Sequence, residues 1–382
     1  FYPKFIGSLS EVCYSRRAQT ARSSMFNPNF AITPAIANCL MQIEACRQAV
    51  STLPVTLTVL NSLRESARLT ATHYSTQIEG NRLTQEQVGA VVLGGTFPNR
   101  ARDEAEVKNY YAALAYLDDF VAQPDTAFDL GTIQTIHGLV MTGRARATPW
   151  RDGQNVIRNA SDGAIVYMPP EAKDVVNLMG ELVYWLNAET HYPAPIFAAI
   201  AHYQFATIHP YYDGNGRTAR LLTNLLLHRS GFGLKGIFSL EEYYARDLQS
   251  YYRALSVGPS HNYYMGRAEA DITDWVAYFC AGMADAFARV RRQAQNAVPV
   301  AGQSDQTHLL RQLDARQRRT LTLFQQHAQI TTRQIADLLG IHPRSALNLC
   351  RKWVSEGFLS QHGESKKLRH YSLGEAWITL IG

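Results

Sequence analysis

Residues 209–220 read His-Pro-Tyr-Tyr-Asp-Gly-Asn-Gly-Arg-Thr-Ala-Arg, and this stretch decides what the chain around it must build. Apolar residues at helical spacing run from Pro193 to Ile208, and Pro210 stops that helix, so His209 should lie at a helix end. A second helix should begin at Arg217 and continue through the leucines that follow. The sequence therefore predicts two helices joined by a short polar loop.

The loop carries residue types that suit phosphate chemistry. Two glycines, Gly214 and Gly216, allow backbone N–H groups to converge on one anion at the start of a helix. Arg217 and Arg220 lie three residues apart, so both side chains can reach phosphate oxygens from one side of that helix. Asp213 offers a hard oxygen ligand of the kind that Mg²⁺ prefers. A calcium loop of the EF-hand type is excluded, because its twelfth position must be Glu and is an asparagine here.

The whole stretch resembles the signature of the Fic (filamentation-induced-by-cyclic-AMP) family, His-Pro-Phe-x-Asp-Gly-Asn-Gly-Arg-x-x-Arg, with Tyr211 in place of the phenylalanine. This resemblance implies transfer of AMP from ATP to a Tyr, Thr or Ser hydroxyl of a protein, with this protein itself among the targets. It also implies that His209 is the general base that accepts the hydroxyl proton. An imidazole suits that role near neutral pH.

The same resemblance assigns a part of the nucleotide to each remaining position. Asp213 would hold Mg²⁺ between the phosphates, Arg217 would neutralise the β-phosphate, and Arg220 would neutralise the γ-phosphate. The α-phosphate would be cradled by Gly214, Asn215 and Gly216. Such a site works mainly by positioning and by charge stabilisation.

A second motif lies upstream, in residues 75–81, Ser-Thr-Gln-Ile-Glu-Gly-Asn. Apolar residues from Leu60 to Ile78 recur at three- and four-residue steps, so Ser75 and Glu79 should share a face of a helix that ends at Gly80. The motif resembles the inhibitory helix of Fic proteins. That resemblance implies that Glu79 pairs with Arg220 and keeps the γ-phosphate from its productive position.

Two further segments resemble parts of the family's nucleotide site. Residues 154–170 contain an Asp-Gly turn followed by the strand-like Ile165, Val166 and Tyr167, which predicts a hairpin flap over the nucleotide. A target segment could add to the edge of such a flap as an extra strand. Tyr252 follows another tyrosine and would line the adenine pocket, although tyrosine pairs on amphipathic helices also serve as core residues.

The end of the chain differs from the rest in charge and pattern. From residue 307 onward, 11 basic residues face 5 acidic ones, a net of +6, whereas the whole chain has a net charge of only +5. A helix over 318–327, a helix starting near Thr332 as a candidate cap, a turn at Gly340 and a helix over 343–357 predict a helix-turn-helix. Two short strands with a charged turn between them would complete a domain that resembles a winged helix.

Two kinds of partner stay open for that domain. Its predicted recognition residues could enter a DNA major groove, with further basic residues on the phosphate backbone. Alternatively, it could dock a protein or a second copy of the chain. The groove candidates are Arg344, Ser345, Asn348 and Arg351, and the backbone candidates are Lys366, Lys367 and Arg369.

Composition is consistent with a cytoplasmic enzyme. The chain has 382 residues, 46% of them apolar, which is enough for more than one core, and no apolar run approaches the ~20 residues of a membrane span. Five cysteines without Cys-x-x-Cys spacing argue against a disulfide framework or a zinc site. We therefore expect no membrane partner, and a homodimer is one of the predicted states.

The predicted fold class is mainly α, a helical Fic fold with a small β-hairpin flap and a C-terminal winged helix-turn-helix. The predicted division is an N-terminal helical region with the inhibitory helix (1–95), a Fic catalytic core (96–290), a linker (291–306) and a winged-helix domain (307–382). Alternative functions also follow from the sequence. These are removal of AMP, transfer of another nucleotide or of a phosphate, and a DNA-binding regulator that senses nucleotide.

Overall fold

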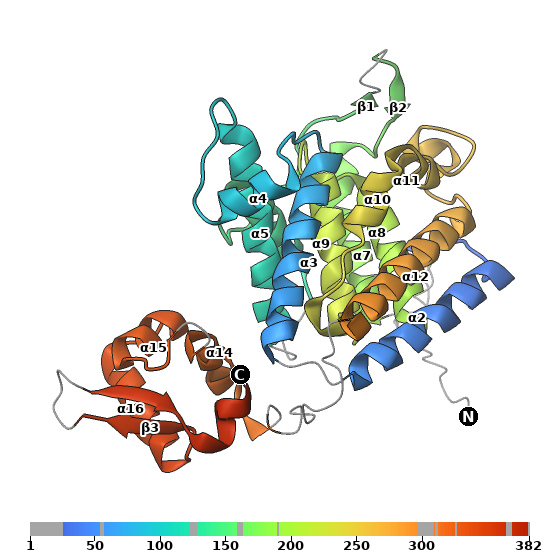
Figure 1. Ribbon diagram of the computed structural model, residues 1–382. Coiled ribbons are helices and arrows are strands. Elements are labelled where there is room, and N and C mark those ends of the chain that lie inside the picture. The colour runs from blue at the N-terminus through green and yellow to red at the C-terminus, as the bar shows by residue number, and fades with distance from the viewer. Residues whose placement is uncertain are drawn as a thin grey trace, which may run out of the picture. The chain divides into compact units, whose positions relative to one another are not determined.

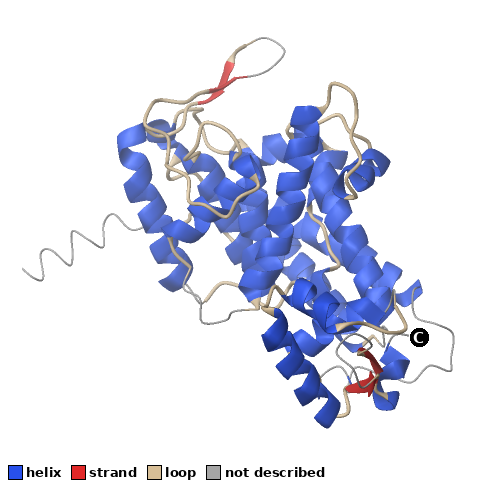
Figure 2. Ribbon diagram, turned by 90° about the vertical axis from the view of Figure 1, so that its left-hand side faces the viewer, coloured by secondary structure: helices blue, strands red, loops and turns tan. Residues whose placement is uncertain are grey.

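The computed structural model describes residues 26–53, 57–122, 128–158, 163–188, 191–296, 309, 312–324, 327–363 and 369–380. Within these ranges the fold is mainly helical, as predicted, and the strands form two short hairpins (Figure 2). Most of the predicted linker and the basic residues Lys366 and Lys367 lie outside the described residues. No described helix is both long enough and apolar enough to cross a bilayer.

The described residues divide into two compact units. The first comprises residues 26–47 and 67–288, and the second comprises residues 48–66 and 289–380. The predicted boundaries at residues 95, 290 and 306 stay predictions.

The described residues between 26 and 167 contain five helices and the first hairpin (Figure 1). These elements are α2 (Pro34–Thr52), α3 (Leu57–Ile78), α4 (Gln85–Val92), α5 (Ala101–Val121), α6 (Leu130–Thr142), β1 (Ile157–Arg158) and β2 (Ile165–Tyr167).

The elements described between residues 172 and 296 are all helices. They are α7 (Ala172–Ala188), α8 (Ala194–Ile208), α9 (Asn215–Arg229), η1 (Leu234–Gly236), α10 (Glu241–Arg246), α11 (Leu248–Leu255), η2 (Tyr263–Arg267) and α12 (Thr273–Asn296).

Helices α8 and α9 are the interior of the first unit. They pack along each other, α7 adds to α8, and α5 and α6 add to α9 (Figure 1). Twelve of the 15 residues of each helix are buried, so neither can be an ordinary amphipathic surface helix. The loop between them, residues 209–214, is therefore fixed at both ends by the core.

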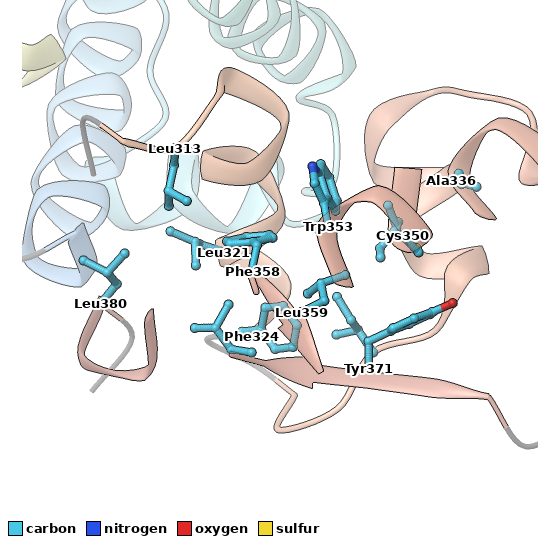
Figure 3. Close-up of a cluster of buried hydrophobic side chains, with 14 residues drawn as sticks. Leu313, Leu321, Phe324, Ala336, Cys350, Trp353, Phe358, Leu359, Tyr371 and Leu380 are labelled. Carbon is cyan, nitrogen blue, oxygen red and sulfur yellow. The ribbon is translucent and has the colours of Figure 1, made fainter. Parts of the chain in front are cut away.

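The C-terminal elements have a core of their own. They are α14 (Ala315–Phe324), α15 (Thr332–Leu339), α16 (Pro343–Ser355), β3 (Leu359–His362), β4 (His370–Leu373) and η3 (Glu375–Leu380). Trp353, Phe358 and Tyr371 are buried together between the helices and the β3–β4 hairpin (Figure 3). This order of elements is the one predicted, and the winged-helix assignment stays a prediction.

Two details of the C-terminal prediction were wrong. The first helix is α14, three residues earlier than the predicted 318–327. The cap of α15 is Thr331 and not Thr332, because the Thr331 hydroxyl accepts a hydrogen bond from the Gln334 amide while the Gln334 side chain accepts one from the Thr331 amide. Gly340 ends α15 with φ 63°, as the predicted tight turn requires.

The central position of α9 makes a test of the core. Leu225 is fully buried on α9, so Leu225→Ala should lower the free energy of unfolding by about 2–5 kcal/mol through lost burial and a residual cavity. The matched control is Leu93→Ala, since Leu93 is 90% exposed and should change stability by less than about 0.5 kcal/mol. Denaturant unfolding followed by fluorescence measures both, and equal losses would contradict the assignment of α9 to the core.

Candidate active site

The loop between α8 and α9 has a backbone that only a few residue types favour. His209 ends α8 in the left-handed region with φ 51°, and Gly214 precedes α9 with φ 77°. The Asn215 side chain closes the loop, since its oxygen accepts from the Tyr211 amide at 3.0 Å and its NH₂ donates to the Tyr211 carbonyl at 2.8 Å. Asn215 thus braces the loop with its side chain, and only its backbone is left to meet an anion.

Two stacked aromatic rings hold the loop in place. Tyr211 is buried and stacks on His137, with ring centroids 3.4 Å apart and planes 3° from parallel. The Nε2 of His137 lies 2.9 Å from the Asp213 carbonyl oxygen, while its Nδ1 lies 2.7 Å from the Thr148 hydroxyl. The Tyr211 ring is therefore held between the loop and α6. No local pattern identified His137, which lies 72 residues away from His209 in the chain.

The surroundings of His209 set the tautomer and the charge of its ring. Its Nδ1 lies 3.3 Å from the Ala206 carbonyl, which can only accept, so Nδ1 carries the proton and Nε2 keeps a free lone pair. Burial lowers the pKa of His209 to about 4, and the nearby Arg151 charge also lowers it, against the Ala206 carbonyl, Glu79 and Asp213. The imidazole is therefore neutral at physiological pH.

The first turn of α9 is an anion cradle. The first backbone hydrogen bond of the helix is donated by Thr218 to Gly214, so the amides of residues 215–217 have no acceptor within the helix. Arg217 lies on this turn and Arg220 on the next one, and the two residues are 3% and 2% exposed. Two buried guanidinium groups and three amides together favour bound negative charge.

Glu79 lies in that cradle. The Nη2 of Arg220 donates to Glu79 Oε1 at 2.8 Å and to the Ser75 carbonyl at 3.0 Å, while its Nε donates to the Ser75 hydroxyl at 2.8 Å. A Cβ added to Gly216 would lie 2.3 Å from Glu79 Oε1, so the carboxylate sits directly against the first turn of α9. The two predicted motifs, 141 residues apart for Glu79 and Arg220, thus meet at one point.

Arg217 makes a second, weaker set of contacts. Its Nη2 lies 3.2 Å from Asp213 Oδ1, and its Nη1 lies 3.8 Å from Oε1 of Glu106 on α5. Glu106 also accepts from Asn81, the last residue of the upstream motif at residues 75–81. Sequence reasoning missed Glu106, because a glutamate on an amphipathic helix has no local feature that distinguishes it.

A hairpin is present where the flap was predicted. Ile157 pairs with Tyr167 and Arg158 pairs with Ile165 in antiparallel register. Ile165 and Val166 are 41% and 39% exposed, whereas Tyr167 is buried and its hydroxyl donates to the Thr207 carbonyl at 2.6 Å. The flap therefore offers two apolar side chains to solvent and anchors itself to α8 with the third.

The two tyrosines on α11 lie in different environments. Tyr251 is buried and its hydroxyl lies 3.0 Å from His202 Nε2, so it belongs to the core. Tyr252 is 47% exposed and is free to contact a ligand. Of the two readings of this pair, the core one applies to Tyr251, and the role of Tyr252 stays a prediction.

Asp213 is the described residue best suited to a metal ion. Its side chain is 55% exposed, and the contacts above engage only Oδ1, through the Gly214 amide and Arg217. No group of three or more metal-ligating side chains occurs among the described residues. One exposed carboxylate fits a Mg²⁺ ion that takes its other ligands from phosphates and water, and does not fit an all-protein metal cage.

The low pKa of His209 can be measured directly. Its Cε1–H resonance, assigned by its loss in His209→Ala, should titrate near pH 4, below the ordinary value of about 6.5. Because the unfolded state then binds the proton first, the His209 contribution to the free energy of unfolding should fall as pH drops from about 6.5 to about 4. A midpoint near 6.5 would show that the imidazole is not desolvated.

Comparisons with known proteins agree with this geometry. Residues 127–227 match the Fic/DOC family. Protein adenylyltransferase fic-1 of Caenorhabditis briggsae is 33% identical over 195 residues, which is 49% of this chain and 38% of that protein. Protein adenylyltransferase Fic of Nematostella vectensis is 30% identical over 198 residues, covering 50% and 45%. The chain thus spans less than half the length of these curated relatives.

Solved structures of Fic proteins have a similar fold. A Fic family protein from Desulfovibrio desulfuricans G20 superposes with a TM-score of 0.58 at 24% identity, over 92% of this chain and 99% of that one. A Fic domain containing signaling protein from Bacteroides thetaiotaomicron VPI-5482 superposes with a TM-score of 0.57 at 21% identity, over 68% and 98%. The loop from His209 to Arg220 lies inside the range, residues 127–227, that matches the Fic/DOC family.

Proposed function

We propose that this protein transfers AMP from ATP to a hydroxyl group of a protein, with Tyr, Thr and Ser as the acceptor residues. The observation that carries the proposal is a neutral imidazole, His209, next to a helix start with two buried arginines. The curated relatives, named protein adenylyltransferases, support the same reaction.

The residues present divide the reaction between them. The Nε2 of His209 takes the proton of the acceptor hydroxyl while the hydroxyl oxygen forms a bond to the α-phosphorus of ATP. The bond from that phosphorus to the pyrophosphate oxygen breaks in the same step. Charge that develops on the pyrophosphate meets Arg217, Arg220 and the free amides of residues 215–217. Asp213 would hold Mg²⁺, which supplies charge neutralisation between the phosphates when it is bound. Tyr252 would contact the adenine.

The contact of Glu79 with Arg220 supports autoinhibition. Arg220 is the arginine assigned to the γ-phosphate, and its guanidinium is occupied by Glu79 and Ser75 in this structure. A γ-phosphate and the Glu79 carboxylate carry like charge, so they would compete for one cation. We infer that the protein is inactive until Glu79 moves.

A mass measurement tests both claims. Glu79→Gly should raise AMP transfer at least about tenfold over wild type, since one buried ion pair no longer competes with the phosphate. His209→Ala in the Glu79→Gly protein should abolish transfer, because no base remains. Each protein is incubated with ATP and MgCl₂, and intact mass reports added AMP on the protein and on proteins of a lysate.

The controls separate the two claims. Glu79→Gln keeps the size of the side chain without its charge and should also be activated. Chelation of the metal should stop transfer. If Glu79→Gly is no more active than wild type, autoinhibition is wrong. If no variant transfers AMP to any protein, while UTP, GTP or phosphate transfer is detected, the nucleotide assignment is wrong.

The alternative functions have less support. De-AMPylation and transfer of other groups could use the same cradle, but the relatives' names favour AMP transfer. A nucleotide sensor would need no base, and His209 is kept neutral and in place. The described cysteines Cys39, Cys46, Cys280 and Cys350 are free thiols, which supports the proposed cytoplasmic location. The homodimer stays a prediction.

The C-terminal unit offers a separate candidate function, binding of duplex DNA. Helix α16 buries Ala346, Cys350 and Trp353, while the four predicted groove residues are all exposed on its other side. Gly340 ends α15 with φ 63°, and the tight turn between α15 and α16 is the connection expected in a helix-turn-helix. Docking of a protein is the competing use of the same face.

A salt series distinguishes these uses. A labelled duplex of mixed sequence should bind the whole protein at low salt, and its affinity should fall as salt rises. Arg344 and Arg351 are groove candidates, so Arg344→Ala with Arg351→Ala should weaken binding, whereas Arg369→Ala, at a phosphate-backbone candidate, should reduce the salt slope by roughly 0.9. Lys173→Ala on α7 is the matched control and should have no effect. Absence of binding at low salt would favour protein docking.

A further inference from the structure

Arg151 is a buried arginine that the reaction above does not use. Its side chain belongs to the segment between α6 and the flap, and the residue is 3% exposed. Three of its N–H groups donate to backbone carbonyls: Nε to His209 at 2.9 Å, Nη1 to Gly153 at 3.0 Å, and Nη2 to Pro170. Its own amide donates to the Pro210 carbonyl at 2.9 Å.

These carbonyls belong to three different places in the fold. Gly153 precedes β1 and Pro170 follows β2, so they are the two ends of the flap. His209 and Pro210 belong to the loop that carries the base. One guanidinium group therefore joins both ends of the flap to the backbone of the catalytic histidine, and its planar fork fixes the directions of all three contacts.

The charge of Arg151 is expensive to bury. Burial lowers its pKa below the ordinary arginine value, and no ion pair to it occurs among the described residues. Neutral side chains would brace a surface hairpin at a lower desolvation cost. An arginine at this position is explained if both its planar fork geometry and its positive charge beside His209 are needed.

We propose that Arg151 is a positioning residue that fixes the flap relative to His209, and so aligns a target segment held on the flap edge with the base. This rests on the proposed AMP transfer. The flap sets where the target backbone lies, and His209 sets where its hydroxyl must be. A displacement of about 1 Å between reacting groups can cost about 100-fold in rate.

Other hydrogen bonds also hold the base of the flap, but each of them connects the flap to only one other segment. The Asn155 side chain donates to the Tyr211 carbonyl at 3.3 Å, and the Tyr167 hydroxyl donates to Thr207. Both would persist without Arg151, so its loss should loosen the alignment and leave the fold intact.

The experiment uses the Glu79→Gly protein as parent and compares Arg151→Lys, Arg151→Gln and the control Arg246→Gln. Arg246 lies on α10, pairs with Asp285 on α12 and makes none of the contacts described above, so its change removes the same charge elsewhere. We expect both Arg151 variants to lower kcat for AMP transfer by about 10- to 100-fold, with KM for ATP changed less than about threefold, because the phosphate cradle is untouched.

The pH profile separates alignment from general structure. The charged groups that face His209 are Arg151, Glu79 and Asp213. With Glu79 absent in all proteins compared, Arg151→Gln should move the acid limb of kcat/KM and the His209 Cε1–H titration to higher pH, whereas Arg151→Lys, which keeps the charge, should leave both nearly unchanged. Arg246→Gln should match the parent in every measurement.

Several results would overturn the inference. Parent-like kcat and titration in a folded Arg151→Gln protein would do so. Equal losses of melting temperature and activity in both variants, with no change in the titration, would assign Arg151 to stability alone. If Arg151→Gln does not fold, Arg151→Lys decides by its kcat.

The test also stands apart from the proposed function. If the parent transfers no AMP, the proposed function fails, while the His209 titration and amide exchange over residues 163–170 still report on Arg151. Faster exchange in both variants and a raised titration in Arg151→Gln alone would keep the link between flap and histidine. Unchanged exchange and titration would remove it.

Discussion

The site depends on one constraint, that the Arg220 guanidinium stays charged although its side chain is only 1% exposed. A buried cation is stable only with an anion and further acceptors beside it. Glu79 and Ser75 supply them here, and this need is what holds the end of α3 against the first turn of α9. The Nη1 of Arg220 finds no acceptor among the described residues and lies near Gly216, so the pairing leaves part of the cradle for another anion.

Helix α9 explains why the cradle is so well defined. The same 15 residues supply leucines to the core and arginines to the site, so core packing and site geometry cannot change independently. A side chain at position 216 would displace the Glu79 carboxylate, because an added Cβ there would lie 2.3 Å from Glu79 Oε1. The fold thus positions the site through its most buried element.

Sequence reasoning succeeded where the information is local. The end of α8 at Ile208 and the hairpin follow from nearby residues, although α9 starts at Asn215 and not at the predicted Arg217, and the Glu79–Arg220 contact followed from the family resemblance. His137, Glu106 and Arg151 were missed, because each acts through partners 58 to 111 residues away that no local pattern reveals. Thr331 was missed by a single position, since two adjacent threonines are equally good caps until the backbone chooses one.

The two sets of contacts around the site differ in how they can be broken. The Glu79 side chain is 25% exposed and holds Arg220 through charge, so an incoming phosphate can replace it without exposing the core. Arg151 holds the flap and His209 through neutral carbonyls and is almost fully buried, so no ligand anion competes for those bonds. The proposed inhibition therefore depends on a contact between charges, whereas the proposed alignment depends on hydrogen bonds to neutral carbonyls. Release of the first can leave the second intact, which is what a switch built beside a preformed site requires.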